Sequence, residues 1–118
     1  MKFEIEQDDS YTVLSLKTER MDSKVAPDLK SQVILLANSS EHGDLVLDLS
    51  TVTFADSSGL SALLMAQRLY RDSDRNLVLC GLTDKVNKLI EISQLQSVFN
   101  IATNRESAVE LLAELGQA

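Results

Sequence analysis

Several side chains that proteins commonly use for chemistry are scarce in this chain of 118 residues. It has one cysteine, one histidine, one proline and four glycines, and 18 acidic residues against 11 basic ones give a net charge of −7. Because phosphate contacts need Lys and Arg, this charge argues against nucleic acid and anionic membranes as main partners. A basic protein surface stays compatible. The scarcity of glycine and proline argues against a disordered chain.

The single histidine and the single cysteine leave little material for catalysis or metal binding. His42 is expected in a solvated loop and Cys80 in a buried strand, so they do not make a zinc site, and Cys80 is expected to be a structural thiol. The sequence lacks the G-x-S-x-G spacing of a nucleophile elbow and the glycine-rich loops that bind phosphate. It also lacks the acidic cluster that a receiver domain phosphorylated on aspartate needs to hold magnesium. We therefore expect no enzyme, no metal and no cofactor.

Long apolar runs are missing as well. The first residues, Met1-Lys2-Phe3-Glu4, lead into an alternating pattern instead of the apolar core of a signal peptide, and no run approaches membrane-spanning length. This pattern predicts a cytoplasmic protein with no membrane insertion. The length and the 44 % of apolar residues predict one domain over residues 1–118, with a core that needs no disulfide.

What the chain does contain is a regular succession of short apolar runs and amphipathic stretches. Phe3 and Ile5 alternate with charged residues, and residues 11–16 are rich in strand formers, which predicts an amino-terminal hairpin. Later strands are predicted at 45–49, 77–80 and 98–101. Helices are predicted from Pro27, over 59–71, and after the capping residues Thr83 and Asn104.

The resulting order, β-β-α-β-α-β-α-β-α, predicts an α/β fold. A buried strand followed by an amphipathic helix is typical of parallel strands that are joined by right-handed helical crossovers. We expect a mostly parallel core of four strands, an antiparallel edge strand from the amino-terminal hairpin, and helices packed on the sheet.

The polar turn before helix 59–71 is the stretch with most functional content. Asp56 or Ser57 can cap the helix, because each offers a side-chain acceptor to a free backbone N–H. Gly59 leaves room for another backbone or a ligand. Ser57 and Ser58 lie near a helix N-terminus, where the helix dipole favours negative charge. A plain helix cap explains these residues taken alone, whereas their place after a central strand favours a ligand or partner site.

The segment Leu45–Leu60, LVLDLSTVTFADSSGL, resembles the signature of the STAS domain, in particular that of the bacterial anti-sigma-factor antagonists. The resemblance extends to residues 77–82 (LVLCGL) and 86–95 (VNKLIEISQL), and it covers nearly the whole chain. In that family, the serine directly after the aspartate is phosphorylated by an anti-sigma factor with kinase activity. Phosphorylation breaks the complex, and a phosphatase resets it.

By this resemblance, Ser57 is the phosphorylated residue, and Asp56, Ser58 and Gly59 complete the partner-binding turn. The loop after the second strand usually helps to contact the partner in this family, which makes Asp22 a further predicted partner-binding residue.

The resemblance implies a non-enzymatic switch with two protein partners. One is an anti-sigma factor with serine kinase activity, which the unphosphorylated chain sequesters, and the other is a serine phosphatase. An accessory subunit of a lipid or solute transport complex stays open as the alternative, since STAS domains occur there too.

Overall fold

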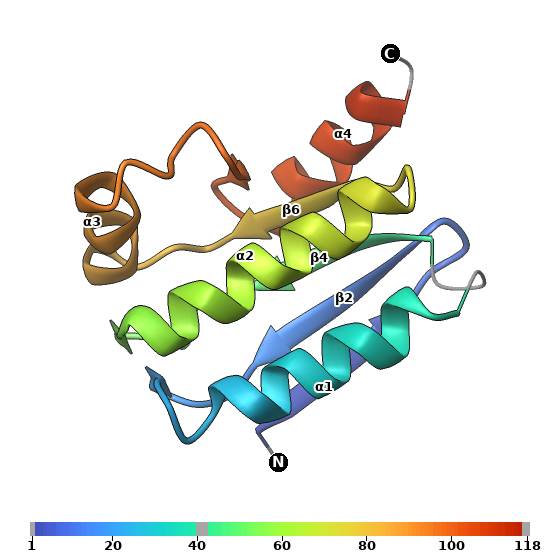
Figure 1. Cartoon of the computed structure of the whole chain (residues 1–118). Coiled ribbons are helices and arrows are strands. Elements are labelled where there is room, and N and C mark those ends of the chain that lie inside the picture. Colours follow the sequence, from blue (N-terminus) through green and yellow to red (C-terminus); the bar gives the residue numbers. More distant parts are fainter. Residues whose placement is uncertain (1, 40–42, 117–118) are drawn as a thin grey trace.

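The computed structural model describes residues 2–39 and 43–116, and its strands and helices alternate along most of the chain (Figure 1). The strands are β1 (Phe3–Gln7), β2 (Tyr11–Leu16), β3 (Arg20–Met21), β4 (Asp44–Asp48), β5 (Phe54–Ala55), β6 (Leu77–Cys80) and β7 (Asn100–Ala102). The helices are α1 (Ala26–Ala37), α2 (Ser57–Asp72), α3 (Asp84–Ile92) and α4 (Arg105–Gly116). His42, which was expected in a loop, lies outside the described residues.

Five of the strands form the main sheet, in the order β1-β2-β4-β6-β7. β1 is antiparallel to β2, whereas β2, β4, β6 and β7 run parallel to their neighbours. The predicted parallel core of four strands with an antiparallel edge is therefore confirmed. Because each parallel pair needs a crossover, α1, α2 and α3 lie between consecutive strands of this core, and α4 follows β7.

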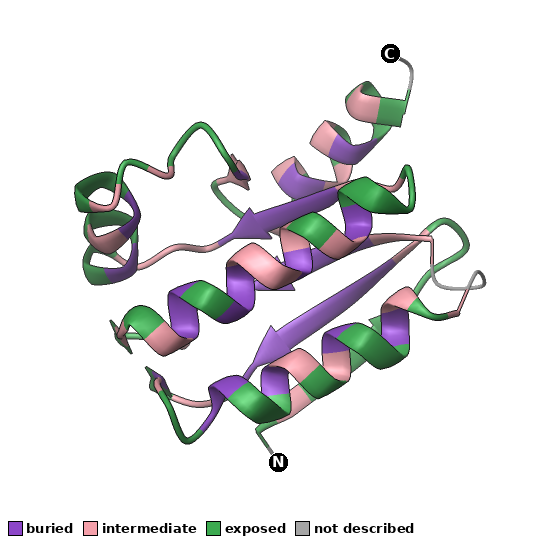
Figure 2. Cartoon of the chain, viewed as in Figure 1, coloured by how far each residue is buried: buried purple, intermediate pink, exposed green. Residues whose placement is uncertain are grey.

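Alternate residues of each central strand face two different layers. Leu14, Leu47 and Leu79 belong to the core that includes residues of α1, α2 and α3, whereas Val46 and Cys80 pack on the α4 side. Figure 2 shows the buried residues along the strands and on the sheet-facing sides of the helices. The prediction that the Cys80 thiol is buried is confirmed. Both faces of the central strands are covered, as their continuous apolar runs indicate.

The last strand and one helix cap differ from the prediction. The strand predicted at 98–101 starts two residues later: Val98 donates its N–H to the Leu95 carbonyl at 3.0 Å in a turn, and β7 begins only at Asn100. Thr83 stands at the N-cap of α3, but its hydroxyl donates to the Val52 carbonyl at 2.7 Å instead of capping. The predicted cap of α4 is present, since Asn104 Oδ1 accepts the Ser107 N–H at 2.9 Å.

The second helix begins at Ser57, two residues before the predicted start, and a small parallel sheet of β3 and β5 was not predicted at all. Each strand of that sheet has two residues, which is too short for any periodic pattern to appear in the sequence.

A charged cluster around Arg105 lies where α4 begins, against the main sheet. Arg105 Nε donates to Asp48 Oδ2 at 2.8 Å and Nη2 donates to Ser15 Oγ at 2.7 Å, while Nη1 donates to a Glu6 carboxylate oxygen. Burial raises the pKa of Asp48, but the hydrogen bonds from Arg105 and Ser50 outweigh burial, so this pKa lies below its ordinary value. The cluster connects α4 to β1, β2 and β4.

Candidate functional site

The turn that leads into α2 is held by one carboxylate. Asp56 is the N-cap in an extended conformation, and its Oδ1 accepts the N–H groups of Ser58 at 2.9 Å and Gly59 at 3.1 Å. The Asp56 carbonyl accepts the first helical hydrogen bond, from the Leu60 N–H at 3.0 Å. Of the two caps that the sequence left open, the structure uses Asp56, because Ser57 is already helical.

Ser57 occupies the first position of α2 and is exposed, whereas Ser58 is partly covered. Within the described residues the Ser57 hydroxyl makes no hydrogen bond. Both serines therefore lie near the helix N-terminus, as the sequence predicts, and they differ in exposure.

Gly59 is buried where α2 meets the loop that contains β3. A Cβ on Gly59 would overlap the Met21 carbonyl oxygen, so only glycine fits this approach. The expectation that Gly59 leaves room for another backbone is therefore confirmed, and that backbone belongs to this chain. The contact explains how residues 20–22 reach the start of α2.

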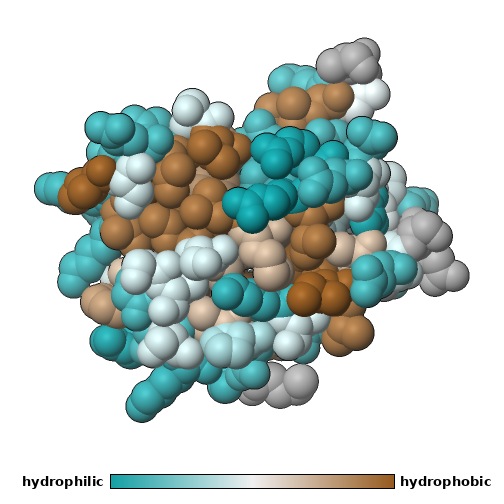
Figure 3. Space-filling model, viewed as in Figure 1, coloured by the Kyte–Doolittle hydropathy of each residue, from teal (hydrophilic) through white to brown (hydrophobic). Residues whose placement is uncertain are grey.

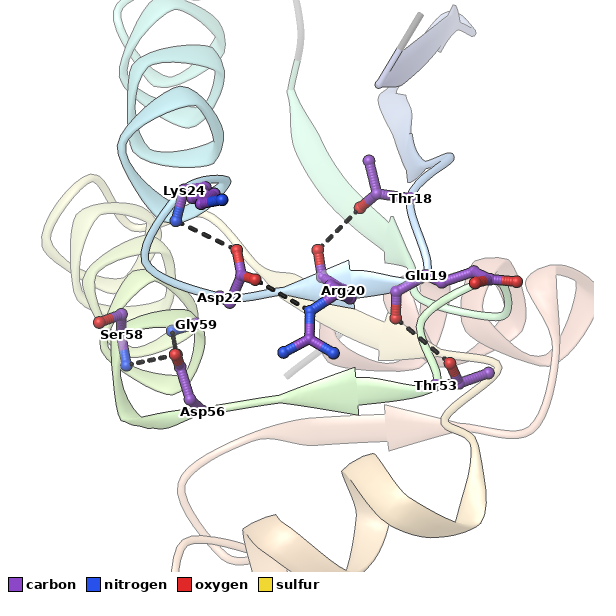
Figure 4. Close-up of polar contacts among 9 residues, drawn as sticks. All are labelled: Thr18, Glu19, Arg20, Asp22, Lys24, Thr53, Asp56, Ser58 and Gly59. Atoms are coloured by element: carbon purple, nitrogen blue, oxygen red, sulfur yellow. Dashed lines mark hydrogen bonds and ion pairs between the residues drawn. The ribbon is translucent and has the colours of Figure 1, made fainter.

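The small parallel sheet sets the positions of two carboxylates. Arg20 is opposite Phe54 and Met21 is opposite Ala55, so Asp22 and Asp56 follow the same ends of adjacent strands (Figure 4). Parallel strands place their carboxyl ends at one edge. The structure therefore brings the predicted residue Asp22 to the turn that contains the other predicted residues, 56–59.

Asp22 is fixed by neighbours on its own loop. Its Oδ2 accepts from Arg20 Nε at 3.1 Å and its Oδ1 accepts the Lys24 N–H at 3.1 Å, as Figure 4 shows. The hydrogen bond from Arg20 is the main reason why the pKa of Asp22 lies below its ordinary value. Asp22 is therefore a charged carboxylate at neutral pH, and its side chain is 15 % exposed.

Two residues of this site were missed in the sequence. The Arg20 guanidinium lies over the Phe54 ring, 4.0 Å from its centre, and both side chains are exposed, Phe54 by 38 %. Arg and aromatic residues are enriched at the energetic centres of protein interfaces. Nothing in the local sequence links them, because they are 34 positions apart and meet only across β3 and β5.

The arrangement suits binding better than catalysis or metal binding. In the described ranges, no three His, Cys, Asp or Glu side chains are gathered for a metal ion. Among the same residues, no helix is both long and apolar enough to cross a bilayer. What the site presents is an exposed hydroxyl on a helix N-terminus, with Asp22, Asp56 and the Arg20–Phe54 pair around it.

Residues 2–108 of this chain match the family model of the STAS domain. The chain is similar to BtrV of Bordetella bronchiseptica, which is assigned as an anti-sigma factor antagonist. The two are 30 % identical over 108 residues, which cover 92 % of this chain and 91 % of the relative. It is also 29 % identical to the anti-sigma-B factor antagonist of Listeria monocytogenes, over 86 % of this chain and 88 % of the relative.

Solved structures share the fold at lower identity. An assigned anti-sigma factor antagonist of Thermotoga maritima has a TM-score of 0.82 and 20 % identity over 94 % of each chain. The Bacillus protein SpoIIAA in its phosphorylated form has a TM-score of 0.70 and 18 % identity, over 92 % of this chain and 96 % of that one.

The same fold also occurs inside the murine anion transporter Slc26a9, with a TM-score of 0.75 and 17 % identity. The match covers 92 % of this chain and 18 % of the transporter. Fold alone therefore does not separate switch proteins from transporter domains. The family match over residues 2–108 establishes that this chain belongs to the STAS domain family, and the 30 % identity to BtrV places it among the anti-sigma factor antagonists, which are non-enzymatic binding proteins.

Proposed function

We propose that this protein is a phosphorylation-controlled antagonist that binds an anti-sigma factor with serine kinase activity while Ser57 is unmodified. A serine phosphatase would restore the binding form. The observation that carries the proposal is the Ser57 hydroxyl, which is exposed at the first residue of α2 and is not engaged by any described residue. A kinase can reach such a hydroxyl without unfolding the turn.

Electrostatics supports the direction of the switch. A phosphate adds about −1.5 to −2 charge at neutral pH, and here it would join Asp56 and the ionised Asp22 at one edge of the small sheet. The two N–H groups that could best hold it, those of Ser58 and Gly59, already donate to Asp56. A partner that fits the unmodified turn would therefore have to desolvate the added charge. A coupling of about 1–3 kcal/mol weakens binding about 5- to 150-fold.

The surface near α2 offers apolar area for a partner. Ile92 is 71 % exposed at the end of α3, Val98 is also exposed, and Leu89 and Leu95 are half-buried. Figure 3 shows brown, apolar surface over α3 and the segment that follows it, beside α2. Apolar area beside a charged, specific contact is typical of protein interfaces.

The test uses single variants and the kinase recovered by affinity pull-down with the unmodified chain. After incubation with this kinase and ATP, mass spectrometry should locate phosphate on Ser57 in the wild type and in Ser58→Ala. Ser57→Ala should stay unmodified and keep most of its binding. Ser61→Ala is the matched control, because Ser61 is another exposed serine of α2 outside the turn.

Ser57→Asp should weaken binding, though less than phosphate, because a carboxylate carries one charge and two acceptor oxygens. Phosphate on Ser58 in the wild type, with Ser57→Ala still modified, would overturn the assignment. A pull-down that recovers transport components and no kinase would favour the alternative, an accessory subunit of a transport complex.

A further inference from the structure

The free edge of β7 lies in a groove that the Ser57 site does not use. β7 pairs with β6 along one edge, and no described strand pairs with its other edge. Beside it lies a hollow of about 550 Å³, whose walls come from the start of α3 and from α4. Figure 1 shows these two helices on either side of β7. An unpaired edge exposes backbone N–H and C=O groups that can pair with another chain.

Residues from both layers of the fold line this groove. Leu82 and Ile101 pack with the core on the α2 side of the sheet, whereas Ala102 and Leu111 pack with the core under α4. A hollow that receives side chains from both faces must open at the edge of the sheet. An added strand would therefore find apolar contacts for its side chains on both of its faces.

The rim of the groove is acidic. Asp84 of α3 and Glu110 and Glu114 of α4 are exposed and line it, and none of the described lining residues is basic. The three carboxylates lie on two different helices, so they flank the edge strand on both sides. Such a rim complements Lys and Arg side chains of a partner.

The opposite edge of the sheet is protected in a way that β7 is not. β1 carries Glu4 and Glu6, and Glu6 is engaged by Arg105. Charged side chains on an edge strand are a common device against pairing. β7, Asn-Ile-Ala, has no charged residue.

We propose that the β7 edge binds an extended segment of a partner protein that is rich in Lys or Arg with apolar residues between them. The segment adds a strand to β7, places apolar side chains on Leu82, Ile101 and Leu111, and places basic side chains at the acidic rim. Backbone pairing gives the affinity in this mode, and the pockets for side chains give the specificity. The groove shares no lining residue with the turn at 56–59, so the inference stands independently of the role of Ser57.

The probe is an acetylated and amidated peptide of eight residues in which pairs of lysines alternate with pairs of valines, so that each face of the added strand carries both residue types, and it is added to the full chain labelled with ¹⁵N. We expect saturable shifts of the backbone amides of residues 100–102, with binding that weakens as salt is raised. A matched peptide with glutamate in place of every lysine should leave these amides unchanged. Shifts confined to β1, or the same response to both peptides, would overturn the proposal.

Variants then separate strand addition from simple charge attraction. Glu110→Lys with Glu114→Lys should weaken binding of the lysine peptide at least about tenfold, whereas Glu4→Lys, on the opposite edge, should have little effect. The lysine peptide with N-methyl groups on two adjacent valines keeps its charge but loses backbone donors toward both of its edges, so it should also bind at least about tenfold more weakly. This second measurement uses the wild-type chain, so it decides the question even if the double variant does not fold. Undiminished binding of the N-methylated peptide would exclude strand addition.

Discussion

The turn at Ser57 and the Arg105 cluster are both built around carboxylates that follow or end a strand, yet they differ in how fully their groups are used. In the cluster, Arg105 bonds three side chains and the Asp48 side chain is 10 % exposed. In the turn, Asp56 Oδ1 accepts two backbone N–H groups, but the Ser57 hydroxyl beside it is exposed and unbonded in the described part of the chain. The cluster engages the charged groups that hold the fold together, whereas the turn leaves one hydroxyl accessible, as the proposed switch requires.

The largest effect on stability should come from breaking the saturated cluster. Arg105→Met leaves the Asp48 carboxylate covered and without its main partner, so the free energy of unfolding should fall by about 2–3 kcal/mol. That is less than for a fully buried pair, because 38 % of the Arg105 side chain is exposed. Urea unfolding measures the loss, with Arg71→Met as the control, since Arg71 is largely exposed and its one ion pair among the described residues is with Asp72. A loss no larger than the control's would mean that the cluster is dispensable.

Although Ser57 is exposed, the backbone of the turn should tolerate an added side chain at Gly59 poorly. Gly59→Ala places a methyl group against the Met21 carbonyl, so either α2 or β3 must shift, at a cost of roughly 1–3 kcal/mol. Gly116→Ala is the control, because no atom of the described residues lies within 4 Å of the Cβ that it would add. Equal stabilities of the two variants in thermal unfolding would contradict the close approach between α2 and β3.

The cap itself should contribute less. Asp56→Ala removes the acceptor of two N–H groups at the start of α2, and the expected loss is about 1 kcal/mol. Asp56→Asn keeps a side-chain acceptor and should restore most of that loss. If Asn and Ala destabilise equally, then the charge of Asp56 matters here and the cap geometry does not.

The smallest expected effect is on the dependence of stability on pH. The folded pKa of Asp48 lies below its unfolded value, so the stability that it contributes is complete above about pH 4 and is lost as the pH falls through the folded pKa. In Arg105→Met, burial without the guanidinium should instead raise the pKa of Asp48. The stability difference between the wild type and this variant should therefore shrink, by about 1 kcal/mol, between pH 6 and pH 3. A difference that stays constant in urea unfolding across this range would show that Asp48 is not the cause.

Local patterns were enough for most of the fold. Short apolar runs such as residues 45–49 and 77–80 have no polar face, so they had to be buried on both sides as parallel strands with helical crossovers. The short polar side chain of Asp56 before a helical stripe predicted a capped turn, and the glycine three residues later predicted the close approach of another backbone or a ligand. These inferences depend on neighbours within a few positions, and the structure bears them out.

Only the tertiary structure decided the contacts between residues that are distant in the sequence. Arg20 meets Phe54, and Arg105 meets Asp48, through strand pairings and helix packing that no local pattern records. The two-residue strands β3 and β5 exist because Gly59 lets the chain approach α2, and they are what brings Asp22 to the turn. The sequence alone determined the order of strands and helices and which apolar residues fill the core, because those choices follow from local patterns. Which charged groups are saturated and which hydroxyl stays accessible depends on how the layers cover them, and that is settled only when the chain packs.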